Sequence, residues 1–189
     1  MGDLTPSAKS QLLAIAKESV ASGVSNGRPI SVILSDYDTQ LSLPRASFVT
    51  LHLAGQLRGC IGSLQAYRPL AQDVAENAFA AAFRDPRFSP VSFAEAQALH
   101  FHISVLSDTS PMTFSDEADL IRQIRPHIDG LVLEDDFHRG TFLPSVWEQL
   151  PDPQQFLNQL KRKAGLPADY WSDRLAVSRY TVEDFEASQ

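Results

Sequence analysis

The residues whose types and spacing best suit chemistry lie together at positions 57–63, which read Leu-Arg-Gly-Cys-Ile-Gly-Ser. This stretch contains the only cysteine of the chain, Cys60, with Arg58 two positions earlier and Gly59 and Gly62 beside it. A cysteine reacts as its thiolate, which nearby positive charge favours. Residues two apart on a strand share a face, and glycines leave space around their neighbours. The spacing therefore predicts a small pocket over Cys60 with Arg58 at its rim.

Two interpretations of Cys60 stay open at this point. In the first, the thiol is a nucleophile or redox group, and Arg58 binds a carboxylate or phosphate through paired hydrogen bonds. A nucleophilic thiol also needs a base, for which His52, His100 and His102 are the candidates. In the second, Cys60 is a small buried hydrophobic residue, as free cysteines often are, and the glycines serve close packing.

A second group of candidates is Asp85-Pro86-Arg87-Phe88, which follows the next predicted helix. Arg87 would complete an anion site with Arg58, or Asp85 would hold a turn while Phe88 fills the core. The candidate catalytic residues are Cys60 and Arg58. The candidate substrate-binding residues are Arg58, Gly59, Ile61, Gly62, Ser63, Asp85 and Arg87.

The remaining histidines and acidic residues give weaker signals. His100 and His102 lie two apart in a predicted strand, so their rings point the same way, which is one arrangement that can hold a metal. A second ligand group with zinc-site spacing is missing from the sequence. Glu134-Asp135-Asp136 falls at a hairpin tip, where a solvated acidic turn is usual. The sequence also has no glycine-rich phosphate loop or serine nucleophile elbow. We therefore predict no metal and no cofactor.

Alternation of apolar and polar residues and the positions of turn residues define the elements that hold these candidates. The predicted strands are residues 30–34, 47–53, 57–61, 99–106, 131–134, 138–142 and 174–182. The predicted helices begin at Pro6, Pro69, Ser92, Asp116 and Asp152 or Pro153, and Gly23 is expected to end the first of them. Lys161, Arg162 and Lys163 end the last helix, where positive charge suits its dipole.

Composition and charge limit the class of protein. A chain of 189 residues is long enough for one domain with a sizeable core and a possible small lobe within it. The net charge of −7 and a pI near 5.1 argue against a nucleic-acid-binding surface. A single cysteine excludes an internal disulfide and fits a reducing compartment. With no signal peptide and no run of about 18 apolar residues, we predict no membrane association and a cytoplasmic location.

Strands and helices interleave irregularly and several strands form hairpins. This order predicts an α+β fold, with a mixed or mostly antiparallel sheet flanked by helices and a smaller second lobe.

Residues 57–62, Leu-Arg-Gly-Cys-Ile-Gly, resemble the signature of the AMME-syndrome candidate-region domain family, whose microbial members are called AmmeMemoRadiSam system protein A. The resemblance covers most of the chain in matching order. Its further elements are residues 46–53, Asp85-Pro86-Arg87-Phe88 with Pro90, residues 103–107, Gly130-Leu131, residues 142–146, Phe156-Leu157, residues 163–166 and Trp171. Residues 24–46 and both ends match only loosely, so nothing functional is carried onto them.

This resemblance implies an α+β fold with a sheet core wrapped by helices. It also implies a Memo-type protein and a radical S-adenosylmethionine enzyme as companions, but no settled activity. Two functions from different classes follow. The first is a small-molecule enzyme, or an accessory subunit of one, with a pocket at residues 58–63 and a small anionic ligand. The second is a non-catalytic binding or scaffold module that docks a Memo-type or radical S-adenosylmethionine partner. The oligomeric state is left open.

Overall fold

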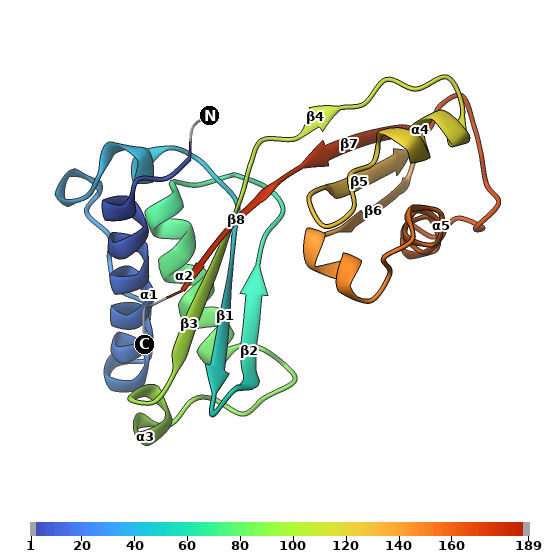
Figure 1. The fold of residues 1–189 in the computed structure, drawn as a ribbon. Coiled ribbons are helices and arrows are strands. Elements are labelled where there is room, and N and C mark those ends of the chain that lie inside the picture. Colours follow the sequence, from blue (N-terminus) through green and yellow to red (C-terminus); the bar gives the residue numbers. More distant parts are fainter. Residues whose placement is uncertain (1–2, 187–189) are drawn as a thin grey trace. The chain divides into compact units, whose positions relative to one another are not determined.

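The structure, a computed structural model, describes residues 3–186. The chain forms two compact units: unit 1 comprises Met1–Leu106 and Glu183–Gln189, and unit 2 comprises Ser107–Val182. Each unit has a hydrophobic core of its own. Helices accompany a four-stranded sheet in each unit (Figure 1), and every strand pair with a described register is antiparallel. The predicted α+β fold with a smaller second lobe is confirmed.

The sheet of unit 1 has the strand order β2-β1-β3-β8. Its strands, in that order, are Gln56–Gly62, Ser47–Leu53, His100–Leu106 and Val182–Glu186. The alternation predicted for β1 is present, because Val49 and Leu51 are fully buried whereas Thr50 and His52 are half-buried. One face of the sheet therefore belongs to the core and the other carries polar side chains.

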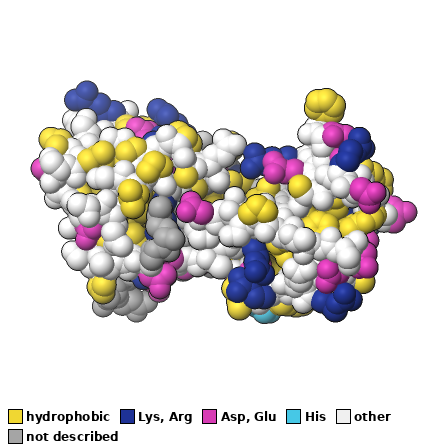
Figure 2. All heavy atoms as spheres, turned by 90° about the horizontal axis from the view of Figure 1, so that it is seen from above, with side chains coloured by type: hydrophobic (Ala, Val, Ile, Leu, Met, Phe, Trp, Pro, Cys, Tyr) yellow, Lys and Arg dark blue, Asp and Glu magenta, His cyan; other side chains and the backbone are white. Residues whose placement is uncertain are grey.

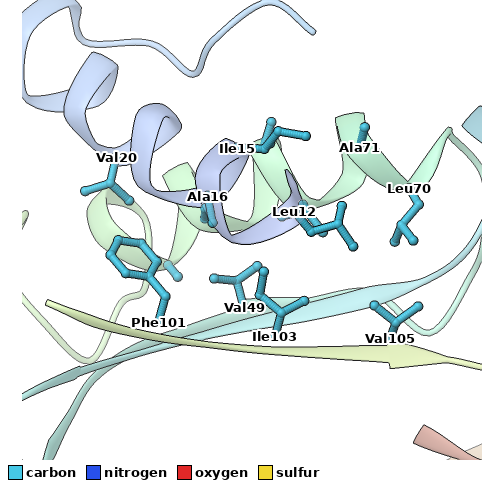
Figure 3. Close-up of a cluster of buried hydrophobic side chains, with 14 of the residues drawn as sticks. Leu12, Ile15, Ala16, Val20, Val49, Leu70, Ala71, Phe101, Ile103 and Val105 are labelled. Carbon is cyan, nitrogen blue, oxygen red and sulfur yellow. The ribbon is translucent and has the colours of Figure 1, made fainter. Parts of the chain in front are cut away.

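Helices α1 (Pro6–Asn26) and α2 (Leu70–Phe83) cover the apolar face of this sheet (Figure 3). Their buried stripes meet apolar side chains of β1 and β3. The labelled members of this core are Leu12, Ile15, Ala16, Val20, Leu70, Ala71, Val49, Phe101, Ile103 and Val105. We call the opposite face of the sheet the Cys60 face, because Cys60 projects from it.

Helix α1 begins as predicted but ends later. The Thr5 hydroxyl accepts the Ala8 N–H at 3.1 Å, and Pro6 occupies the first turn. The helix continues past Gly23 to Asn26, and Gly27, at φ 69°, is its C-cap. Gly23 is buried, and a methyl group at this position would overlap the Phe83 ring. It serves close helix packing, and the prediction that it ends the helix is wrong.

The strand predicted at residues 30–34 is not formed. This segment has no strand partner and leads into two short 3-10 helices, η1 (Leu34–Asp36) and η2 (Thr39–Ser42). Ile30 and Val32 pack on the unit 1 core instead. Their alternation thus reflects packing of an irregular segment, which the period of two cannot distinguish from a strand.

The helix start predicted at Ser92 is confirmed, because Ser92 and Glu95 form a capping box at the start of the short helix α3 (Phe93–Ala96). The Glu95 N–H donates to the Ser92 hydroxyl at 3.4 Å, and the Ser92 N–H donates to the Glu95 carboxylate at 2.8 Å.

Unit 2 contains a second sheet with the order β4-β7-β5-β6. These strands are Ser110–Pro111, Ala176–Tyr180, Gly130–Asp135 and His138–Phe142. Three helical segments accompany the sheet: α4 (Glu117–Gln123), η3 (Pro144–Glu148) and α5 (Pro153–Lys163). In its core the ring of Trp147 stacks on Phe156 at 3.7 Å, and the indole N–H donates to the Asp129 carbonyl at 2.7 Å.

One prediction in this half of the chain is wrong. Residues 174–182 do not form one strand: β7 pairs within unit 2, and β8 then joins the unit 1 sheet. Lys161, Arg162 and Lys163 lie in the last turn of α5 as predicted. The Lys161 side chain is fully buried, and its Nζ lies 2.8 Å from the Glu117 carboxylate and 3.2 Å from the Ala168 carbonyl. It therefore links α5 to α4 and to the segment after α5.

In the part of the chain that the structure describes, no helix is long and apolar enough to cross a bilayer. On the surface seen in Figure 2, the Lys and Arg groups of the described residues stand apart and alternate with acidic ones.

Candidate functional site

The family-type stretch at residues 57–62 lies on the edge strand β2, where the strand contains a β-bulge. Leu51 pairs with Gly59, but His52 pairs with Leu57, so Arg58 is an additional residue. An inserted residue breaks the alternation of side chains. The prediction that Arg58 and Cys60 share one face, with Arg58 at the rim of a pocket over the thiol, is therefore wrong.

Arg58 is bound to another part of unit 1. Its Nε and Nη2 donate to the two carboxylate oxygens of Glu95 in α3, at 2.9 and 3.2 Å. Its guanidinium lies 5.9 Å from the centre of the Phe88 ring, and only 11% of the side chain is exposed. Hydrogen bonds from Arg58 hold the pKa of the Glu95 carboxyl low, at about 2. Arg58 thus joins the hairpin to α3 through a paired ionic contact.

The glycines and their neighbours serve packing and turn formation. A methyl group at Gly59 would overlap the Ala81 carbonyl oxygen of α2, and one at Gly62 would overlap the Phe48 ring. Neither glycine has a positive φ. Ile61 packs against the unit 1 core. The Ser63 N–H donates to the Ser47 carbonyl at 3.1 Å, and its hydroxyl accepts from the Gln65 N–H at 3.1 Å.

Asp85 and Arg87 bind the backbone of Cys60 on the outer edge of β2. The Asp85 carboxylate accepts the Cys60 N–H at 2.9 Å, and Arg87 Nη2 lies 3.4 Å from the Cys60 carbonyl oxygen. Arg87 also bonds Asp85 directly, at 2.7 Å. This pair satisfies edge groups that a further strand would otherwise bind.

Asp85 and Arg87 differ in how much of each side chain is exposed to solvent. The Asp85 side chain is only 2% exposed, whereas Arg87 is 54% exposed. Hydrogen bonds from Arg87 hold the pKa of Asp85 well below its ordinary range. The pKa of Arg87 is raised, first by Asp85 and to a smaller extent by the charge of Cys60. Arg87, and not Arg58, is the cation bound to the Cys60 backbone.

Four polar residues, one from each strand of the unit 1 sheet, form a row across the Cys60 face. Thr50 on β1 is the cross-strand partner of Cys60 on β2 and also of His102 on β3. The Thr50 hydroxyl donates to Cys60 Sγ at 3.1 Å. His102 Nε2 lies 3.3 Å from the carboxylate of Asp184 on β8. We call Cys60, Thr50, His102 and Asp184 the Cys60 row.

The pKa values of His102 and Asp184 are both shifted. A hydrogen bond from His102 lowers the pKa of Asp184, and that of His102 is raised chiefly by the same bond. Ser104 also donates to Asp184. The other candidate bases lie further along the strands, since His52 pairs with His100 and His100 binds Glu186 at 3.1 Å. His102 is therefore the histidine beside Thr50.

The structure also bears on the metal candidates. Within residues 3–186, no group of three or more His, Cys, Asp or Glu side chains is arranged to hold a metal ion. Glu134-Asp135-Asp136 is not a fully solvated turn, because Asp135 is 2% exposed and accepts a hydrogen bond from the Tyr170 hydroxyl at 2.7 Å. Arg174 binds the neighbouring Asp136 at 2.8 Å.

Sequence reasoning missed three residues of this site: Thr50, Glu95 and Asp184. The alternation of β1 places Thr50 on the polar face. A correct register between β1 and β2 would have identified Thr50 as the cross-strand partner of Cys60. Glu95 was recognisable as part of a capping box but not as the partner of Arg58. Asp184 carries no local signal, since Ser104 and Asp184 are 80 positions apart.

These features define an α+β protein whose edge strand presents a half-buried cysteine, with a histidine–carboxylate pair on the same sheet face two strands away. Residues 13–185 match the family model AMMECR1, and the chain belongs to this family. Protein MJ0810 of Methanocaldococcus jannaschii is 32% identical over 159 residues, which cover 82% of this chain and 79% of that protein.

Two further proteins resemble the chain over most of its length. A protein of Thermococcus gammatolerans is 36% identical over 184 residues, covering 93% of this chain and 88% of that one. The crystal structure of the uncharacterized protein PH0010 from Pyrococcus horikoshii has a TM-score of 0.80 and 31% identity, covering 93% and 89% of the two chains.

Proposed function

We propose that this AMMECR1-family protein is a cytoplasmic small-molecule enzyme, or an accessory subunit of one, that uses Cys60 as its nucleophile. The observation that carries the proposal is the Cys60 row, which aligns a thiol, a hydroxyl, an imidazole and a carboxylate on one sheet face. These groups are the parts of a nucleophile, its base and the group that orients the base.

The chemistry of the row follows from its order. Asp184 holds Nε2 of His102, which leaves Nδ1 of the neutral ring to accept a proton. The Thr50 hydroxyl, which donates to Cys60 Sγ at rest, turns to give its proton to its cross-strand neighbour His102 while it takes the thiol proton. The sulfur then bonds to an electrophilic carbon, whose carbonyl π pair moves to oxygen. The protonated His102 returns the proton to that oxygen, or to a leaving group whose bond to the carbon breaks as the oxygen electron pair re-forms the carbonyl. Arg58 takes no part, because it is bound to Glu95 and only 11% of its side chain is exposed.

The test is alkylation of the folded protein by iodoacetamide, which is clean because the chain has one cysteine. We expect Cys60 to react without unfolding. Thr50→Val and His102→Gln should both slow the reaction near neutral pH, whereas Thr50→Ser should retain the rate. His100→Gln is the matched control, since it removes the histidine two positions away on the same strand. Equal rates for His100→Gln and His102→Gln would remove His102 from the mechanism.

A second candidate function is a binding module that docks a Memo-type or radical S-adenosylmethionine partner. It is favoured by the edge position of β2, because an edge strand can pair with a strand of another protein, and its residue Leu57 is 41% exposed. The same alkylation experiment separates the two functions. If Cys60 reacts only after unfolding, it is a packing residue, and docking becomes the better explanation of this surface.

A further inference from the structure

We propose that the substrate of the Cys60 site is an anionic electrophile, whose carboxylate or phosphate binds Arg87 while Cys60 attacks a carbon close to that group. This inference deepens the proposed function and rests on it.

The position of Arg87 relative to the nucleophile is the first step. Arg87 Nη2 lies 3.4 Å from the backbone carbonyl oxygen of Cys60, so the guanidinium lies at the edge of β2 next to the residue that carries the thiol. The Asp85 carboxylate anchors the guanidinium through Nε at 3.0 Å and Nη2 at 2.7 Å. Because two bonds fix its orientation, Arg87 loses little freedom when a ligand binds.

The second step is the difference in exposure within the ion pair. Asp85 is buried, and its two oxygens are occupied by Arg87 and the Cys60 N–H, so it presents little negative charge to a ligand. Arg87 is 54% exposed. A ligand approaching Cys60 along this edge therefore meets the guanidinium and not its carboxylate. Nε and Nη2 of Arg87 are engaged by Asp85 and by the Cys60 carbonyl, so the carboxylate or phosphate binds Nη1, which has two further N–H donors.

The third step excludes the other arginines nearby. Arg58 has both carboxylate oxygens of Glu95 as partners and is nearly buried. Arg84 lies over the ring of Phe79, 4.9 Å from its centre, at the end of α2. The anion-binding role expected for Arg58 thus passes to Arg87.

The experiment compares the alkylation of Cys60 by iodoacetate and by neutral iodoacetamide. In both reactions the sulfur forms a bond to the CH₂ carbon and iodide leaves, so the ratio of the two rates cancels the ionisation of the thiol. The reference is the same ratio in the urea-unfolded protein. We expect the folded protein to favour iodoacetate over this reference by no more than about fivefold, the effect of one unit charge about 4 Å away in water, because Asp85 offsets part of the Arg87 charge.

Three variants test whether Arg87 causes the preference for iodoacetate. Arg87→Gln should bring the ratio to the reference or below it, because Asp85 then lacks its ion-pair partner, and Arg87→Lys should retain most of the preference because it keeps the charge. Arg84→Gln is the matched control, since it removes the same charge three positions earlier, and it should leave the ratio unchanged. Melting curves of all three establish that they are folded. Raising the salt concentration should weaken the preference through screening.

The outcomes separate this inference from the proposed function. If neither reagent reacts with the folded protein, the nucleophile is overturned and the substrate class with it. If iodoacetamide reacts but the ratio equals the reference, only the anionic substrate is overturned. An equal loss of preference in Arg84→Gln and Arg87→Gln would show a general surface field and overturn the assignment to Arg87.

Discussion

At the scale of residues, one additional amino acid changes which arginine contacts Cys60. The bulge at Arg58 turns this side chain to Glu95, so the residue that stands two positions from Cys60 in the sequence is not its electrostatic partner. Arg87, 27 positions away, takes that place through the Cys60 backbone. Spacing along a strand is a reliable guide only while its register is unbroken.

The His102–Asp184 pair gives a prediction at this scale. Because the hydrogen bond with Asp184 raises the pKa of His102, Asp184→Asn should lower that pKa toward its ordinary value of about 6.5. The measurement is an NMR titration of the His102 ring in wild type and variant. Glu186→Gln is the control, because Glu186 contributes only a smaller charge effect to His102. An unchanged His102 titration in Asp184→Asn would contradict the assigned hydrogen bond.

At the scale of elements, the fit of β2 against α2 depends on a glycine. The Ala81 carbonyl oxygen occupies the space where a side chain of residue 59 would lie. Since the chain at Gly59 has no positive φ, its requirement for glycine is one of room and not of backbone conformation. The alanine-rich end of α2 allows the same close approach from the helix side.

Gly59→Ala should therefore destabilise the protein by about 1–3 kcal/mol, the usual cost of overpacking. Urea unfolding measures this free energy. The control is Gln56→Ala on the same strand, where the side chain is exposed and the change should stay within about 0.5 kcal/mol. Equal stability of Gly59→Ala and wild type would mean that α2 moves away without cost.

At the scale of the whole molecule, the chain builds unit 1 from two separate stretches, with unit 2 inserted between β3 and β8. The edge strand β8 brings acidic residues to unit 1: Asp184 and Glu186 bind histidines on the Cys60 face, and Glu183 binds Lys9 on the other. Ion pairs formed by Asp85 and Glu95 tie further segments to the same sheet. The fold of unit 1 thus depends on carboxylates in several places.

This dependence predicts acid sensitivity. Asp85, Glu95 and Asp184 have lowered pKa values in the folded protein, so each contributes stability above its unfolded pKa of about 4 and loses it as the pH falls through its folded value. His102 has the opposite sign: its contribution is complete below about 6.5 and is lost as the pH rises through its raised pKa.

Urea unfolding followed by far-UV circular dichroism should accordingly show a steep loss of stability below about pH 4. Asp85→Asn should flatten this acid limb, because the variant has no carboxylate to protonate at that position. Parallel pH curves for wild type and Asp85→Asn would contradict the role given to the Asp85–Arg87 pair.

The sequence by itself determined the local elements and the family. Helix caps at Thr5 and Ser92, the alternation of β1 and the hairpin before Cys60 were all predictable, because each depends on residues a few positions apart. The stretch at 57–62 also identified the family, to which the match over residues 13–185 assigns the chain.

The tertiary structure alone decided the composition of the site. The partner of Arg58, the placement of Arg87 on the Cys60 backbone, the division of residues 174–182 into β7 and the start of β8, and the position of Asp184 beside His102 all join distant segments. Such contacts are set by sheet register and by packing against α2, and neither leaves a periodic pattern in the sequence. The physical reason is the range of the forces: capping and alternation act locally, whereas register is fixed only when whole strands meet.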